Sequence, residues 1–112
     1  MNFQVEKNNK YRIISVRIKS ATIEHSDEFK AIFEEMMIDD FEHLLIDLTE
    51  CDFIDSTFMG ALVRCHKEMQ RKNGEVKIIC TGKVKFLLHD VTHLSSVMQL
   101  FDTVAEAVSD FY

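Results

Sequence analysis

The sequence contains no proline, only three glycines, and no repeat or low-complexity tract. Because nothing resembles a flexible linker, the 112 residues are expected to form a single domain spanning residues 1–112. The glycines stand at positions 60, 74 and 82, where they form neither a GxGxxG motif nor a P-loop. The chain therefore has no phosphate-cradling loop of the kind that binds nucleotides.

Long apolar runs, paired cysteines and excess positive charge are also missing. No apolar run approaches the roughly 18 to 20 residues that a membrane-spanning helix needs, and the first residues lack the pattern of a signal peptide. We therefore expect a cytoplasmic protein without membrane insertion. Cys51, Cys65 and Cys80 form no CxxC pair, which predicts reduced thiols and no disulfide. The net charge of −6 argues against nucleic acid as a partner.

The hydrophobic pattern of the first half of the chain predicts a hairpin, a helix and a buried strand. Hydrophobic residues make up 46% of the chain, enough for a packed core. Apolar residues alternate near positions 3–5 and 14–18, with a turn expected at Asn8-Asn9. Helical spacing from a cap at Ser26 predicts the first helix, as far as residue 37. Residues 43–48 are nearly all apolar, which predicts a central strand of a parallel sheet.

The second half alternates helices and strands. A helix is predicted over roughly residues 57–72, ended by Asn73-Gly74, then a strand at 76–80, a helix within 84–91 and a strand at 97–101. Thr103 and Glu106 have the spacing of a capping box that opens a last helix. The fold class is therefore α/β: a mixed, mostly parallel sheet with an N-terminal hairpin, packed against about four helices. The connection at 48–56 lies where such sheets bind ligands and partners.

Ser56 stands in that connection, directly before the second predicted helix, and its role has two interpretations. The simpler one is an N-cap whose hydroxyl accepts a hydrogen bond from a free amide of the helix. In the other, Ser56 accepts a phosphate, which the positive end of the helix tolerates. Glu50, Asp52 and Asp55 surround it, so the added negative charge would intensify an acidic patch and repel a bound partner.

Two motifs around this serine carry a resemblance to a known family. Residues 44–49 read LLIDLT and residues 53–60 read FIDSTFMG, and further similarity runs through residues 74–79, 94–96 and 101–107. This pattern resembles STAS domains, the family of bacterial anti-sigma factor antagonists and sulphate-transporter C-terminal domains. The resemblance implies a non-enzymatic protein without a cofactor. Its unphosphorylated form binds an anti-sigma factor, and a serine kinase switches it off at Ser56.

The resemblance also implies further partners and roles. A phosphatase could reset the switch, and Asp55 would orient the loop or contact the partner's kinase-like domain. We expect the free protein to be a monomer, with a partner-binding surface made of six residues: Asp52, Asp55, Ser56, Thr57, Phe58 and Met59. The competing hypothesis is a scaffold module of the same fold that serves a signalling complex or a transporter without being phosphorylated.

The chain departs from the family pattern after the serine. Thr57-Phe58 precede Met59-Gly60 where the family usually has a small residue and then a glycine. A buried Phe58 would extend the apolar stripe of the helix, whereas an exposed Phe58 would form an apolar anchor with Met59 beside Ser56. Thr57 is a second candidate phosphate acceptor, less favoured than Ser56.

Catalytic and metal sites find little support. The aspartates lack a nucleophile–base pair, so catalytic residues are not predicted. His89 and His93 stand four apart and could share a helix face, but no third metal ligand lies nearby in the sequence. Cys65 and His66 are adjacent and so point to different sides of a helix. We expect no enzyme, no metal and no cofactor.

Overall fold

The computed structural model describes residues 1–8 and 10–110, so Asn9 of the predicted turn lies outside the described residues. Within them, a five-stranded sheet has the order β1-β2-β4-β6-β7. β1 and β2 form the predicted antiparallel hairpin, and the other neighbours are parallel. The strands are β1 (Phe3–Lys7), β2 (Tyr11–Val16), β4 (His43–Asp47), β6 (Glu75–Ile79) and β7 (Gln99–Phe101).

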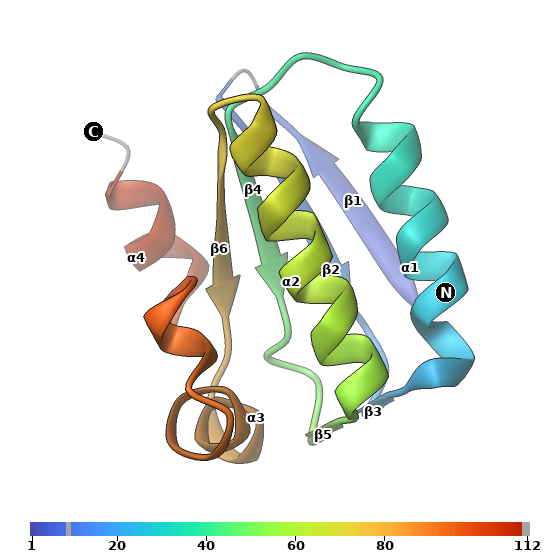
Figure 1. The fold of residues 1–112 in the computed structure, drawn as a ribbon, viewed down its shortest axis with the longest axis vertical. Coiled ribbons are helices and arrows are strands. Elements are labelled where there is room, and N and C mark those ends of the chain that lie inside the picture. Colours follow the sequence, from blue (N-terminus) through green and yellow to red (C-terminus); the bar gives the residue numbers. More distant parts are fainter. Residues whose placement is uncertain (9, 111–112) are drawn as a thin grey trace.

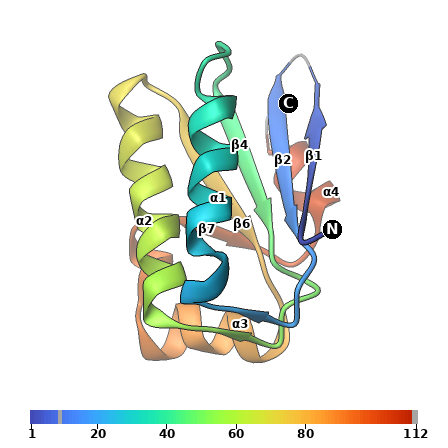
Figure 2. The same ribbon diagram turned by 90° about the vertical axis from the view of Figure 1, so that its right-hand side faces the viewer.

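Helices cover both faces of this sheet. α1 (Ile23–Met36) and α2 (Ser56–Arg71) lie side by side on one face, and α4 (Val104–Ser109) lies on the other (Figures 1 and 2). α3 (Gly82–Phe86) lies at the edge where β4 and β6 end. The predicted α/β class, with a mixed sheet and an N-terminal hairpin, is confirmed.

The continuous apolar run of β4 places this strand at the centre of the sheet, as predicted. Leu44 and Ile46 belong to the large core beneath α1 and α2, whereas Leu45 belongs to a small cluster beneath α4. All three side chains are fully buried. Because successive side chains of a strand point to opposite faces, a strand covered on both faces must be apolar at consecutive positions.

The start of α1 differs from the prediction. The helix begins at Ile23, with Thr22 as its N-cap, so the predicted cap at Ser26 is wrong. Ser26 instead lies in the first turn, where its hydroxyl donates a hydrogen bond to the carbonyl oxygen of Ile23 at 2.9 Å. The helix is preceded by the short strand β3 (Ser20–Ala21), which pairs in parallel with β5 (Phe53–Ile54). Strands of two residues show no periodicity, and the sequence therefore predicted neither.

The other helix ends follow the predicted signals closely. α2 stops before Asn73, which takes the left-handed conformation with φ of 62°. Gly74 is required for a different reason, because a Cβ there would lie 2.8 Å from the carbonyl oxygen of Glu42. Thr103 caps α4 by accepting a hydrogen bond from the backbone N–H of Glu106 at 3.1 Å. None of the helices in the described part of the chain has both the length and the apolarity to cross a membrane.

The third predicted helix is irregular. α3 is followed by a π-helical turn over Leu87–Val91 and a 3₁₀ turn over Leu94–Ser96. His93 lies between these turns in the left-handed conformation, with φ of 57°. His89 and His93 therefore do not share a regular helix face.

Candidate functional site

The candidate site lies where the first residues of α1 and α2 meet the small β3–β5 sheet. The β3–β5 pairing brings residues 20–21 beside residues 53–54, so two segments far apart in sequence form one rim (Figure 1). Backbone hydrogen bonds hold the loop there: the amides of Asp52 and Phe53 both donate to the carbonyl oxygen of Lys19, at 2.7 and 3.1 Å. The amide of Asp55 donates a hydrogen bond to the carbonyl oxygen of Ala21 at 3.1 Å. The loop that carries Ser56 is therefore fixed by the segment entering α1.

Asp55, and not Ser56, is the N-cap of α2. One carboxylate oxygen of Asp55 accepts a hydrogen bond from the backbone N–H of Phe58 at 2.8 Å, within the first turn of α2. The other oxygen accepts one from the backbone N–H of Ile23, also at 2.8 Å, at the start of α1. A single side chain thus satisfies unpaired amides at two helix ends, where a negative charge is also favoured by the helix dipoles.

This geometry corrects the cap interpretation of Ser56. Ser56 is the first residue of α2, its side chain is exposed, and its hydroxyl makes no hydrogen bond to another described residue. Thr57 is exposed as well. The hydroxyl of Ser56 is therefore available to solvent or to another protein.

The structure decides between the two interpretations of Phe58. Its side chain is fully buried, with its ring centre 4.9 Å from that of Phe29 on α1. The buried alternative is confirmed, and the prediction that the side chain of Phe58 belongs to the partner-binding surface is wrong. Met59 is partly buried against the core. Phe58 instead packs α2 onto α1, which sets the position of the neighbouring Ser56.

The rim around Ser56 carries apolar side chains that sequence reasoning missed. Ile23 and Phe53 are 65% and 48% exposed, one at the start of α1 and the other on β5. The sequence pattern assigned no surface role to Ile23 and placed Phe53 only in the connection before α2. Only the turn from β3 into α1 and the edge position of β5 expose them. They flank Asp55, whose carboxylate binds the amide of Ile23.

The rim is also electronegative. Asp52 is exposed, and Glu50 forms an exposed ion pair with Arg17 at 2.9 Å. Cys51 lies buried beneath them, and its pKa is raised to about 12, first by burial and then by the charges of Asp47, Glu50 and Asp52. This thiol is therefore protonated at neutral pH, and a further negative charge on the rim would add to an existing excess.

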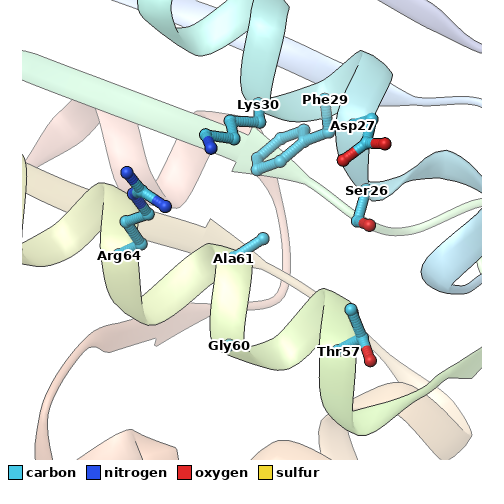
Figure 3. A pocket seen from close by; sticks show the side chains of 8 residues that line it. All are labelled: Ser26, Asp27, Phe29, Lys30, Thr57, Gly60, Ala61 and Arg64. Carbon is cyan, nitrogen blue, oxygen red and sulfur yellow. The ribbon is translucent and has the colours of Figure 1, made fainter.

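A groove extends from this rim between α1 and α2. It has a volume of about 280 Å³, and Thr57 lines it at the end nearest Ser56. Figure 3 shows Lys30 of α1 and Arg64 of α2 pointing toward one another across it. Sequence reasoning missed this groove, because the two basic residues lie 34 positions apart and belong to different helices. The lining residues are Ser26, Asp27, Phe29, Lys30, Thr57, Gly60, Ala61 and Arg64.

The remaining candidates do not assemble into a reactive centre. Burial raises the pKa of Cys65 to about 12, so its thiol is not a ready nucleophile. His89 Nδ1 lies 2.6 Å from Ser95 Oγ, but His89 is exposed and Ser95 only partly buried, so the contact lies at the surface. In the part of the chain that the structure describes, no three His, Cys, Asp or Glu residues are grouped to hold a metal ion.

Comparison with known proteins places these features in a family. The STAS domain family matches residues 3–107, and the chain belongs to this family. Among its relatives is the anti-sigma F factor antagonist of Paenibacillus polymyxa, 22% identical over 112 residues that cover 98% of this chain and 96% of the relative. The anti-sigma-B factor antagonist of Listeria monocytogenes is 26% identical over 106 residues, covering 83% of this chain and 93% of the relative.

Solved structures show the same fold. An anti-sigma factor antagonist from Mycobacterium paratuberculosis superposes with a TM-score of 0.85 at 18% identity, covering 96% of this chain and 91% of the other. The Bacillus cell fate determinant SpoIIAA in its phosphorylated form superposes with a TM-score of 0.75 at 14% identity, covering 98% of this chain and 99% of the other. These likenesses establish the architecture.

Proposed function

We propose that this chain is an anti-sigma factor antagonist that binds an anti-sigma factor of the serine-kinase type through the surface around Ser56. Phosphorylation of Ser56 switches this binding off and so regulates transcription that depends on a sigma factor. The observation that carries the proposal is the exposed hydroxyl of Ser56, at the first position of α2 and without a hydrogen bond to another described residue. Membership of the STAS family and the names of the relatives support it.

The electrostatics of the rim explain how one phosphate acts as a switch. A phosphoserine carries roughly −1.5 to −2 charges at neutral pH. At the first position of α2 it stands beside the free amides of the helix end, which accommodate an anion, so the fold tolerates the modification. Asp52 and Asp55 are already on this rim, and the added charge deepens a negative potential that a docked partner meets directly.

The partner-binding surface in this proposal consists of Asp52, Asp55, Ser56, Thr57 and the accessible part of Met59. Ile23 and Phe53 join it as exposed apolar contacts on either side of Asp55. The proposal implies a cytoplasmic protein that is a monomer when free and whose phosphorylated form is reset by a phosphatase. Thr57 is the less favoured candidate acceptor, because it is exposed next to Ser56.

Binding of three purified proteins to a purified kinase-type anti-sigma factor tests the proposal. Wild type and Ser56→Ala are expected to bind with similar affinity, because the hydroxyl makes no internal bond. Ser56→Asp is expected to bind at least about tenfold more weakly, because it places a carboxylate at the position of the phosphate. If all three proteins bind with the same affinity, the proposal of a phosphorylation switch is wrong, and the result supports the scaffold hypothesis.

Intact-mass measurement after incubation with the same partner and ATP identifies the acceptor. Wild type should gain one phosphate group, and Ser56→Ala should gain none, whereas Thr57→Ala should behave as wild type does. A phosphate that still appears on Ser56→Ala and disappears from Thr57→Ala would move the modification to Thr57.

A further inference from the structure

Lys30 and Arg64 bring two positive charges together on a chain whose net charge is −6. Lys30 projects from α1 and Arg64 from α2, and the two side chains point toward each other (Figure 3). Both line the groove next to Thr57, and both also line a second hollow further along the same two helices. The cation pair therefore lines both of two neighbouring hollows between α1 and α2.

Neither cation forms an ion pair with a carboxylate of the described residues. Glu68, one helical turn beyond Arg64, is instead engaged by Arg71 at 3.2 Å. Asp27 and Glu34 line the two hollows, but neither reaches Lys30 or Arg64. Because these carboxylates stay beyond ion-pair distance of both cations, the two facing charges repel each other, and an anion held between them relieves this repulsion.

The space beside the cations suits a protein side chain. A Cβ added at Gly60 would meet no atom within 4 Å, so the wall there is open. Ala61 contributes only a methyl group, and the ring of Phe29 lies on the opposite side of the groove (Figure 3). A volume of about 280 Å³ accommodates a few side chains. A carboxylate entering it can bind the guanidinium of Arg64 through two parallel hydrogen bonds and the ammonium of Lys30 through a third.

The groove is continuous with the Ser56 surface, since Thr57 belongs to both. Arg64 lies seven residues further along α2, a distance of about 10 Å at 1.5 Å per residue. We propose that the groove receives an aspartate or glutamate of the partner protein, held between Lys30 and Arg64 while the rim around Ser56 is docked. This inference rests on the proposed function, and it names the second anchoring point of the same partner.

Such an arrangement fixes the orientation of the partner. The docking surface is negative around Asp52 and Asp55 and positive at the cation pair, so a partner with the reverse order of charges is favoured in one orientation only.

Charge reversal tests the inference against the same purified kinase-type anti-sigma factor. Lys30→Glu and Arg64→Glu should each weaken binding roughly tenfold, and the loss should shrink as salt concentration rises. Lys67→Glu is the matched control, because Lys67 is exposed on the same helix and lines neither hollow. It should bind within about twofold of wild type. Affinities of Lys30→Glu and Arg64→Glu equal to that of Lys67→Glu would overturn the inference.

Zero-length carbodiimide cross-linking of the complex provides a second readout. The reagent joins an amine to a carboxylate in direct contact, so Lys30 should be linked to one partner Asp or Glu, identified by peptide mass spectrometry. Reversing that partner residue to Lys should restore binding to Lys30→Glu. If the complex forms but no cross-link involves Lys30, the inference is overturned while the proposed function is not contradicted. A wild-type chain that binds no kinase-type anti-sigma factor would instead overturn the proposed function, and the inference with it.

Discussion

Replacing Asp55 by Ala should destabilise the protein more than any other change in the exposed loop. The carboxylate accepts hydrogen bonds from Phe58 and Ile23, each at 2.8 Å, and so ties the starts of two helices together. Loss of an N-cap costs about 1 kcal/mol, and a hydrogen bond to a charged group contributes about 1.5 to 3 kcal/mol. Because Asp55 is only partly buried, we take the lower end of this range, about 1.5 kcal/mol, for the hydrogen bond from Ile23. The expected total loss in the free energy of unfolding is then about 2 to 3 kcal/mol.

The expected loss is a large fraction of the stability of a domain of this size, which is about 5 to 15 kcal/mol. Urea unfolding at pH 7 measures it, and the thermal midpoint should fall by roughly 8 to 12 °C. Asp55→Asn keeps one carbonyl oxygen but turns an amide N–H₂ toward one of the two donors. Its loss should therefore be about half that of Asp55→Ala.

Asp52→Ala is the matched control for the change in charge. Asp52 lies on the same rim and is exposed, and only its backbone is held in place, by Lys19. Its replacement should change the free energy of unfolding by no more than about 0.5 kcal/mol. If Asp55→Ala were as stable as Asp52→Ala, the argument that one carboxylate joins α1 to α2 would be wrong.

Three further changes test the packing and protonation of the core. Phe58→Ala should cost about 3 to 5 kcal/mol in urea unfolding, whereas Phe53→Ala, at an exposed position, should cost under about 1 kcal/mol; equal losses would contradict the burial of Phe58. Lys77 is fully buried and binds Asp110 at 2.8 Å and the carbonyl oxygen of Ala107 at 3.2 Å. Lys77→Ala should therefore destabilise the protein, and Lys77→Met, which fills the same space, should lose less; the reverse order would refute this role. Burial raises the pKa of the three thiols from 9.0 to about 11 or 12, so the folded state retains protons that the unfolded state releases. Stability should be unaffected below pH 9 and fall above it by about 1 kcal/mol per thiol per pH unit, and a urea midpoint that stays constant from pH 8 to 10 would contradict this.

The pattern of apolar residues predicted the order of the main elements correctly, because that pattern is local. The alternating Ile14 and Val16 of β2, the continuous run in β4 and the helical stripe of α2 each reflect which side of one element faces the core, whereas Val5 of β1 is 40% exposed. The predicted exposure of Ser56 also agrees with its position, since a residue at the start of an amphipathic helix can lie off the apolar stripe.

The cap of α2 shows where local reasoning fails. Asp55 and Ser56 are adjacent, and both residue types are common N-caps, so composition alone could not choose between them. The choice was made by the backbone N–H of Ile23, which lies 32 residues earlier in the chain and offers the carboxylate of Asp55 a second donor. A serine hydroxyl could not have satisfied both helix ends.

The sequence by itself determined the fold class, the central position of β4 and the membership of the STAS family, because these depend on residue patterns within single segments. Tertiary structure alone decided which side chains form the surface. The two-residue strands β3 and β5 carry no periodic signal, yet their pairing exposes Ile23 and Phe53 beside Asp55. Likewise, Lys30 and Arg64 become a pair only when α1 packs against α2, because a charge on an exposed helix face does not specify its neighbour across a groove.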